Sequence, residues 1–337
     1  MIQRINSISQ FITSTYVNLK SYTTYSLKED FMNCDYSYAN TCYQFNGDIG
    51  LKCKTYQIIA PPQEQNRVVG IESIMNPRPV FDDSNYQGSN KLQDKVAIIT
   101  GGDSGLGRAA AIAYAKEGAD LVIVYYDEHD DANETKCYIE QLGRSCLLLA
   151  GDISDNSFCT FVVNETIRTY GKIDILVNNA GVQYQQDELE GISDEQFDWT
   201  MKVNVYGMFY LTKAALPYLK EGASIINLSS VTAFDGEPRL IDYVTTKGAI
   251  VGFTRSLANN LALKNIRVNA IAPGPFWTPL QPNCWCPEVI PTFGSGTAFG
   301  RAAMPYELAP TYVYLASDDS KYMTGQVLHV NGGQYFG

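Results

Sequence analysis

The sequence predicts an α/β protein with one doubly wound parallel sheet of seven strands, helices on both faces and an irregular N-terminal arm. Three observations support this fold class. From residue 95 onward, short apolar runs alternate with segments of helical spacing. Runs that are apolar at every position are typical of parallel strands buried on both faces. A glycine-rich turn directly follows the first run, and 337 residues suffice for one such domain with an additional N-terminal part.

The apolar runs give the predicted strands, at 95–100, 120–126, 146–152, 173–179, 223–229, 266–272 and 326–330. The helical segments between them comprise a stretch that ends at Glu117 and the ranges 130–142, 156–170, 194–216, 243–264 and 305–317. An open parallel sheet binds its ligands beyond the carboxyl ends of its strands. We therefore expect the functional residues at those ends.

The chain before this domain divides into two predicted parts. Residues 1–54 form a leader whose order the sequence does not define. Its first 28 residues contain no acidic residue, as in organellar transit peptides, but they contain few bases and many poor helix formers. We expect a cytoplasmic protein, with organellar import as the alternative. Residues 55–94 contain four prolines and are predicted as a Pro-rich extended arm on the surface of the domain at 95–337.

Composition and charge exclude several function classes. Hydrophobic residues make up 45% of the chain, which is enough for a packed core. The excess of 36 acidic over 25 basic residues gives a net charge of −11, which repels nucleic acids and anionic lipids. No apolar run approaches the roughly 20 residues of a membrane-spanning helix. We therefore expect neither a nucleic-acid partner nor a membrane.

The cysteine and histidine pattern predicts no metal site. Eight cysteines without a C-x-x-C pair are too sparse for a disulfide scaffold, and two histidines are too few for a His-rich zinc site. Cys284 and Cys286 form a C-x-C pair, which could hold a metal or a labile disulfide. The alternative is that both are ordinary thiols in a reducing cytosol.

The glycine-rich turn carries the first functional signal. Gly101, Gly105 and Gly107 follow the first predicted strand with the spacing G-x-x-x-G-x-G and open a helix. Glycines let a backbone approach a pyrophosphate closely, and the amides at a helix start donate hydrogen bonds to it. The turn alone is a weak signal, because such turns also serve packing. Its place after the first strand of an alternating fold predicts dinucleotide binding.

A second signal is a pair of residues on one helical segment. Tyr243 and Lys247 are four residues apart, so both side chains project from the same helix face. A phenol has a pKa of about 10, and a neighbouring ammonium group lowers that value toward neutral pH. The pair is therefore suited to exchange a proton with an alcohol or a carbonyl. Ser230 ends a predicted strand, where its hydroxyl can face the same cleft or can simply cap a turn.

Taken together, these motifs resemble the short-chain dehydrogenase/reductase family, which has a Rossmann-type fold. The resemblance spans about residues 91–337 and rests on Thr100-Gly101, Gly105, Gly107, Asn178-Asn179-Ala180-Gly181, Ser230, Tyr243, Lys247 and Pro273-Gly274. The run GGDSGLGRA, the arm with PPQEQNR and GIESIMNP, and the segment YELA resemble a bacterial subgroup related to glucose/ribitol dehydrogenases and general-stress oxidoreductases. The leader has no counterpart in that subgroup.

The resemblance implies a role for each catalytic candidate. Tyr243 is the general acid/base, Ser230 polarises the substrate oxygen, and Lys247 lowers the tyrosine pKa and holds the nicotinamide ribose. Asn204 supports a proton-relay water, although its side chain could also bend the helix. The implied function is an NAD(P)-dependent oxidoreductase that interconverts an alcohol and a carbonyl. The alternative is an NAD(P)-binding sensor or scaffold, and reduction of a carbon–carbon double bond is disfavoured by Tyr243, Lys247 and Ser230 together.

The resemblance also implies the cofactor contacts. Besides Tyr243 and Lys247, they are Gly101, Ser104, Gly105, Leu106, Gly107, Tyr125, Tyr126, Asp152, Ile153, Asn179, Ala180, Gly181, Pro273, Gly274 and Thr278. Asp127 and Glu128 follow the second strand, where an acidic group accepts from the 2′-hydroxyl of the ribose in NAD. No base follows this strand closely, so we expect NAD rather than NADP. Arg108, one residue past the glycine turn, is the base that could favour NADP.

Substrate contacts are predicted around a segment rich in aromatic residues, prolines and glycines at 275–304, which resembles a lid. The candidates are Gln183, Tyr184, Glu237 and Trp277. Polar groups there would suit a hydroxylated aldehyde, sugar or polyol, whereas aromatic groups would suit a larger substrate. The family commonly forms homotetramers through the helices here at 194–216 and 243–264 and through the last strand, and we expect the same of this chain.

Overall fold

The computed structural model describes residues 38–43, 52–57 and 60–337. The chain divides into two compact units, Met1–Ile58 and Ile59–Gly337. In the first unit, strands β1 (Tyr38–Tyr43) and β2 (Lys52–Gln57) pair antiparallel. Most of the predicted leader lies outside the described residues. Residues 60–337 all belong to the second unit.

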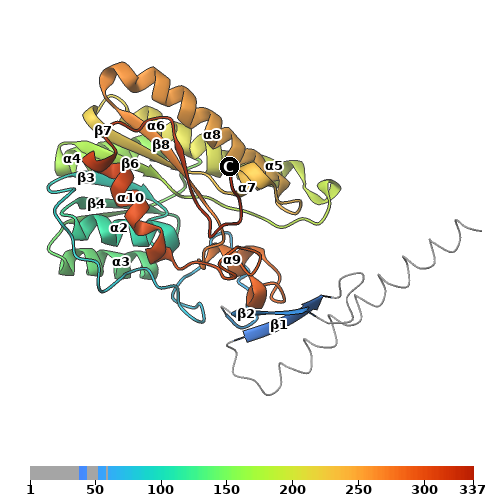
Figure 1. The fold of residues 1–337 in the computed structure, drawn as a ribbon. Coiled ribbons are helices and arrows are strands. Elements are labelled where there is room, and N and C mark those ends of the chain that lie inside the picture. The colour runs from blue at the N-terminus through green and yellow to red at the C-terminus, as the bar shows by residue number, and fades with distance from the viewer. Residues whose placement is uncertain (1–37, 44–51, 58–59) are drawn as a thin grey trace, which may run out of the picture. The chain divides into compact units, whose positions relative to one another are not determined.

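The second unit is built on the predicted seven-stranded parallel sheet, which is confirmed (Figure 1). Its strands stand in the order β5-β4-β3-β6-β7-β8-β9. Their bounds are β3 (Val96–Thr100), β4 (Asp120–Tyr125), β5 (Cys146–Ala150), β6 (Ile173–Asn178), β7 (Leu219–Leu228), β8 (Arg267–Pro273) and β9 (Val327–Val330). The chain order reverses between β3 and β6. A doubly wound sheet forms its ligand crevice at this reversal.

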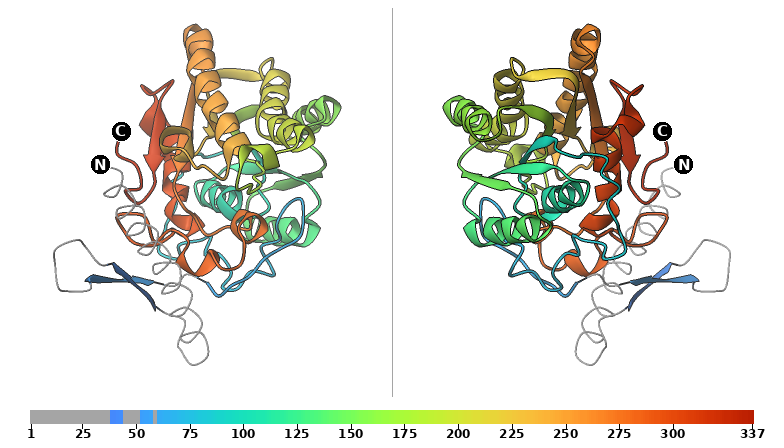
Figure 2. Two further views of the ribbon diagram at one scale, coloured as in Figure 1. Left: turned by 90° about the vertical axis from the view of Figure 1, so that its right-hand side faces the viewer. Right: turned by 90° about the vertical axis from the view of Figure 1, so that its left-hand side faces the viewer.

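Helices cover both faces of the sheet (Figures 1 and 2). Helices α2 (Gly105–Lys116), α3 (His129–Gln141) and α10 (Ala309–Ala316) contribute to one hydrophobic core. Helices α4 (Asn156–Tyr170), α6 (Met208–Ala215) and α8 (Ile241–Leu261) contribute to a second core. The remaining α-helices are α5 (Asp194–Met201), α7 (Thr232–Asp235) and α9 (Leu280–Cys284). The central strands β3 and β4 are almost entirely apolar because both contribute residues to the two cores.

Local chemistry accounts for several helix ends. The Asp155 side chain accepts from the Ser157 amide at the start of α4, and Gly171 ends that helix with a left-handed φ of 74°. The predicted helix at 305–317 begins as α10 only after the 3₁₀ turn Pro305–Glu307, because Pro310 stands in its first turn. The predicted helix at 194–216 is interrupted by a π-helical turn, Lys202–Gly207, between α5 and α6.

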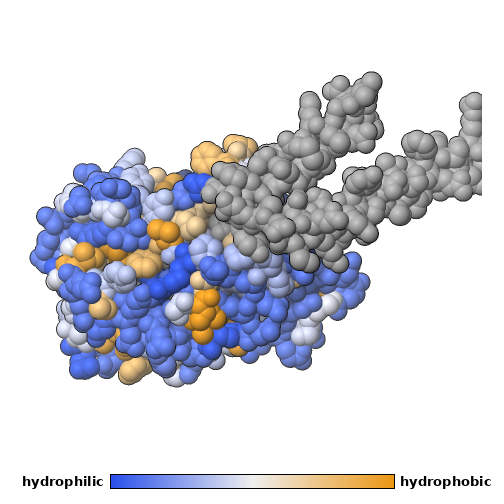
Figure 3. Space-filling view, turned by 90° about the horizontal axis from the view of Figure 1, so that it is seen from below, coloured by the Kyte–Doolittle hydropathy of each residue, from blue (hydrophilic) through white to orange (hydrophobic). Residues whose placement is uncertain are grey.

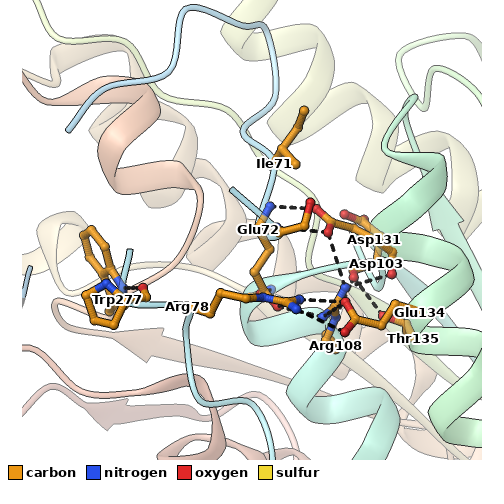
Figure 4. Close-up of polar contacts among 12 residues, drawn as sticks. Ile71, Glu72, Arg78, Asp103, Arg108, Asp131, Glu134, Thr135 and Trp277 are labelled. Carbon is orange, nitrogen blue, oxygen red and sulfur yellow. Dashed lines mark hydrogen bonds and ion pairs between the residues drawn. The ribbon is translucent and has the colours of Figure 1, made fainter. Parts of the chain in front are cut away.

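Residues 60–94 contain neither a helix nor a strand and lie against the sheet domain. Figure 4 shows where this segment, which we call the arm, contacts α2, α3 and the chain after β8. The Trp277 indole donates to the Pro77 carbonyl at 2.8 Å, and the Gln65 amide donates to the Pro282 carbonyl at 2.7 Å. The arm therefore joins elements that surround the carboxyl ends of the strands.

The described surface in the view of Figure 3 is mainly hydrophilic, and its apolar residues form small separate groups. Among the helices of the described residues, none has the length and hydropathy needed to cross a membrane. Over the same residues, no group of three or more His, Cys, Asp or Glu side chains could hold a metal ion. Cys284 is half-buried, Cys286 is exposed, and both are free thiols.

Candidate active site

Two adjacent cavities lie beyond the carboxyl ends of the central strands, as expected. The first, of about 160 Å³, extends over the glycine turn and the ends of β4 and β5. The second, of about 170 Å³, extends over the ends of β7 and β8. Both are lined by Leu106, Asn179, Gly181, Leu228, Thr278 and Leu280. The cavities are therefore neighbours that share one wall, with the glycine turn on one side and Tyr243 on the other.

The glycine turn has the backbone that its residues require. Gly101 and Gly105 have φ angles of 62° and 50°, in the left-handed region that favours glycine. A Cβ on Gly107 would lie 1.9 Å from the Gly101 carbonyl oxygen, so only glycine fits. The Asn179 side chain donates to the carbonyl oxygens of Thr100 at 2.8 Å and Gly101 at 3.1 Å, which fixes the turn against the end of β6.

The start of α2 fits the pyrophosphate of a dinucleotide. Arg108 makes the first helical hydrogen bond, from its amide to the Ser104 carbonyl. Within the described residues, the amides of Leu106 and Gly107 have no acceptor, and Leu106 lines both cavities. Unpaired amides at a helix N-terminus bind anions. This part of the chain therefore has the donors that a dinucleotide cofactor needs.

Nearly all predicted cofactor residues line one of the two cavities. Those in the first cavity are Gly101, Ser104, Gly105, Leu106, Tyr125, Tyr126, Asp152, Ile153, Asn179, Ala180, Gly181 and Thr278. Those in the second include Tyr243, Lys247, Pro273 and Gly274. Gly107 lines neither and serves the close contact within the turn.

Three predicted catalytic residues meet in the second cavity. Ser230, Tyr243 and Lys247 all line it, and the Ser230 side chain acts to lower the pKa of Tyr243. The Lys247 Nζ lies 5.3 Å from the Tyr243 ring centre and donates to the Leu228 carbonyl at 2.8 Å. Burial raises the pKa of Tyr243 to about 12 and lowers the pKa of Lys247 to about 7. A reacting group there would be shielded from bulk water.

Asn204 lies in the π-helical turn and lines neither of the two cavities. Its side-chain oxygen accepts from the Val182 amide at 2.8 Å, and its nitrogen donates to the Val182 carbonyl at 2.9 Å and to the Thr246 hydroxyl at 3.0 Å. Asn204 thus joins the turn to the chain after β6 and to α8. A π-helical turn inside an α-helix is often a functional feature.

The predicted substrate residues separate into two groups. Gln183 and Glu237 line the second cavity, together with Leu240, Gln281, Trp285, Phe293 and Gln334. Tyr184 and Trp277 line neither cavity. The Tyr184 hydroxyl instead accepts from the Trp199 indole at 3.0 Å. Trp277 is fully buried, because its indole packs beneath the arm. The predicted lid is partly regular, with α9 and the bridge between Phe276 and Ala303.

The arm supplies functional candidates that the sequence analysis missed. Val68, Val69 and Gly70 line the first cavity. The Glu72 carboxylate accepts from the Gly105 amide at 2.6 Å, directly at the start of α2. Arg67 lies beside the end of β4, where its Nη2 is 2.7 Å from the Asp127 carboxylate. The sequence did not predict these contacts, because the two partners of each contact are some 30 to 60 residues apart in the chain.

Figure 4 shows the buried charged cluster that holds the arm. Arg108 is fully buried, with its Nη1 2.8 Å from Glu72 Oε1 and 3.0 Å from Glu134 Oε2. Its Nη2 donates to the Asp131 carbonyl at 2.8 Å. Burial raises the pKa of Glu72 to about 7, and Arg108 and the Gly105 amide act in the opposite direction. Arg108 is therefore occupied by the arm and by α3, so it is not the free base that the sequence analysis considered.

Comparison with known proteins gives a consistent result. Residues 101–334 match the family model described as enoyl-(acyl carrier protein) reductase. General stress protein 39 of Bacillus subtilis is 54% identical over 275 residues, which cover 82% of this chain and 96% of that protein. Glucose and ribitol dehydrogenase of Daucus carota is 43% identical over 279 residues, with coverage of 81% and 96%.

Solved structures agree in fold. A short-chain dehydrogenase from Burkholderia cenocepacia in complex with NADP has a TM-score of 0.68 and 30% identity, covering 72% of this chain and 99% of that one. A 3-ketoacyl-(acyl-carrier-protein) reductase from Brucella melitensis complexed with NADH has a TM-score of 0.66 and 34% identity, with coverage of 73% and 100%.

The fold and the site define an oxidoreductase with a Rossmann-type nucleotide-binding domain. More narrowly, the chain belongs to the short-chain dehydrogenase/reductase family. The predicted resemblance to glucose/ribitol dehydrogenases and general-stress proteins is confirmed.

Proposed function

We propose that the chain is a nicotinamide-dependent oxidoreductase that interconverts an alcohol and a carbonyl, with Tyr243 as the general acid/base. The observation that supports this most is that Tyr243, Ser230 and Lys247 line one cavity. Both residues with hydroxyl groups line a cavity that shares lining residues with the one over the glycine turn. A substrate oxygen in the second cavity can thus contact both hydroxyls beside a bound cofactor.

The proposed mechanism assigns one task to each side chain. When bound, the nicotinamide supplies or accepts the hydride. In the direction of reduction, Tyr243 donates its hydroxyl proton to the substrate oxygen, and Ser230 donates a hydrogen bond to that oxygen. In its protonated form, Lys247 favours the resulting phenolate electrostatically, which a phenol with a pKa of about 12 requires. Asn204 positions this machinery, because it ties the chain after β6 to α8.

The preferred cofactor is NAD(H). The end of β4 carries Tyr125, whose hydroxyl is 2.9 Å from the His129 Nδ1, followed by the carboxyl groups of Asp127 and Glu128. Glu128 lines the first cavity, where a carboxyl oxygen can accept from a ribose 2′-hydroxyl. The solved relatives bind NADP in one case and NADH in another, so the family allows either.

The substrate class we propose is an aldehyde, ketone, sugar or polyol. The second cavity combines the amides of Gln183, Gln281 and Gln334 with the aromatic rings of Trp285 and Phe293. Amides donate to and accept from hydroxyl groups, while aromatic faces pack against carbon. The matching family model is described as an enoyl reductase, which reduces a carbon–carbon double bond. The paired hydroxyls of Ser230 and Tyr243 favour an oxygen atom as the proton acceptor instead.

A binding and turnover experiment tests this proposal. The full chain is titrated with NADH and NADPH while nicotinamide fluorescence is followed. Oxidation of the bound reduced cofactor is then recorded with a panel of aldehydes, ketones and ketoses, and its formation with sugars and polyols. We expect tighter binding of NADH and turnover of at least one carbonyl or hydroxyl compound. Binding without turnover on the whole panel would instead support a nucleotide-binding sensor or scaffold.

A further inference from the structure

We propose that Arg67 of the arm is a cofactor-selectivity residue that binds the 2′-phosphate of NADP(H), so that the site accepts this cofactor beside NAD(H). The inference rests on the proposed function and concerns the adenosine end of the same site. It assigns a cofactor contact to a segment that precedes the nucleotide-binding domain in the sequence.

Arg67 lies beside the residues that follow β4. In a doubly wound fold, the residues after the second strand face the adenosine ribose, and an arginine nearby accommodates a 2′-phosphate. Here β4 is that strand, and the Arg67 Nη2 lies 2.7 Å from Asp127 Oδ1 and 3.9 Å from Glu128 Oε1. The next arm residues, Val68 to Gly70, line the first cavity together with Tyr125 and Tyr126.

Among the described residues, Arg67 is a basic group that lies at the adenosine end of the site, next to the residues after β4. The lining of the first cavity contains no lysine or arginine among the residues that the structure describes, and Arg67 lies just outside it, with its Nη2 3.9 Å from Glu128 of the lining. Arg108 is buried and occupied by Glu72 and Glu134. A guanidinium group binds phosphate through two parallel hydrogen bonds, so one arginine can distinguish NADP from NAD.

The arm holds the guanidinium in place. The Arg67 Nε donates to the Val69 carbonyl at 3.1 Å, which leaves the two Nη groups for other acceptors. Three residues further on, Gly70 lies against the chain after β8, where an added Cβ would be 2.5 Å from the Pro279 oxygen. The Glu72 amide then donates to Asp131 at 2.6 Å. Arg67 is therefore presented from an anchored segment rather than from a free chain end.

The acidic partners of Arg67 can be exchanged for a phosphate. Asp127 is 52% exposed and Arg67 is 37% exposed, and an ion pair at such exposure contributes little stability. A phosphate can thus replace Asp127 on the guanidinium, while Asp127 turns to solvent. Burial also raises the pKa of Glu128, which reduces its repulsion of a phosphate. The same carboxylates remain available to the 2′-hydroxyl of NAD, in line with the preference proposed above.

Fluorescence titration of the full chain with NADH and NADPH tests the inference. We expect Arg67→Gln to weaken NADPH binding at least ~10-fold and NADH binding less than ~2-fold, because one bidentate phosphate contact is lost. Asp127→Asn removes the competing carboxylate and should strengthen NADPH binding. The matched control is Arg78→Gln, because Arg78 anchors the arm through Glu134 at 2.6 Å. It should leave the ratio of the two dissociation constants unchanged.

The possible failures are distinguishable. If the unaltered chain binds neither cofactor, the proposed function is wrong. If it binds NADH but not NADPH, or if Arg67→Gln leaves the ratio of the dissociation constants at its original value, only the role of Arg67 is wrong. A ratio that changes equally in Arg67→Gln and Arg78→Gln would show that Arg67 acts through the docking of the arm, which also contradicts its role as a phosphate contact.

Discussion

Tyr243 and Lys247 show how far the sequence defines single residues. Their spacing on a helix predicted that both side chains face one direction, and both line the second cavity. The sequence could not show that the Lys247 ammonium donates to the Leu228 carbonyl, because this contact depends on how α8 packs against β7. Arg67 is the opposite case, since its neighbours at the end of β4 are 60 residues away along the chain.

Lys247 leads to a prediction about stability and pH. Burial lowers its pKa to about 7 in the folded chain, whereas the unfolded value is about 10.5. Between these values the unfolded chain binds more protons, so the contribution of Lys247 to stability rises with pH. Relative to Lys247→Met, the free energy of unfolding should therefore rise by about 1 kcal/mol per pH unit. Urea unfolding at pH 7.5 and pH 9.0 measures this, and an equal difference at both pH values would contradict it.

At the scale of elements, the sequence predicted what local chemistry dictates. All seven strands were predicted, because strands buried on both faces are rich in apolar residues. The π-helical turn at Lys202–Gly207 was not, since it is coupled to the contacts of Asn204 with Val182 and Thr246. The contacts between the arm and the sheet domain could not be predicted either. Irregular segments have no periodicity, and their ion pairs join residues that are distant in the sequence.

The arm gives a prediction at this scale. Glu72→Gln leaves the fully buried Arg108 without one of its carboxylate partners, at a distance of 2.8 Å. We expect the free energy of unfolding to fall by about 2–4 kcal/mol, since breaking one side of a buried ion pair is strongly destabilising. Limited proteolysis should also cut the arm faster.

The control for this variant is Glu64→Gln, because Glu64 is an exposed residue of the same arm. It should change stability by less than about 0.5 kcal/mol. Equal unfolding curves and equal cleavage rates for the two variants would show that the Glu72 contacts do not hold the arm.

At the scale of the whole molecule, exposed aromatic side chains bear on assembly. The expected homotetramer was inferred from the family resemblance and from the helices at 194–216 and 243–264. Tyr206 and Phe209, in the first of these ranges, are 41% and 43% exposed. Aromatic side chains that remain exposed on a helix often lie in an interface between subunits. We propose that these two belong to the interface of the tetramer.

Light scattering on the full chain measures the assembly directly. We predict a mass of four chains for the unaltered protein and a smaller assembly for Phe209→Asp, because a charge in an apolar interface opposes association. The control is Ile74→Asp, which changes an exposed arm residue outside the two helices. A single-chain mass for the unaltered protein would contradict the proposed tetramer.

The most direct test of the central claim is the turnover rate of Tyr243→Phe, measured beside its affinity for NADH. The variant loses only the hydroxyl that donates the proton, so we predict at least a ~1,000-fold fall in turnover with NADH affinity changed less than ~2-fold. The control is Tyr170→Phe. It removes a hydroxyl that is hydrogen-bonded to Ser145 and is distant from Tyr243 in the sequence, so this variant should retain full activity. Full turnover by Tyr243→Phe would contradict the assignment of this tyrosine as the general acid/base.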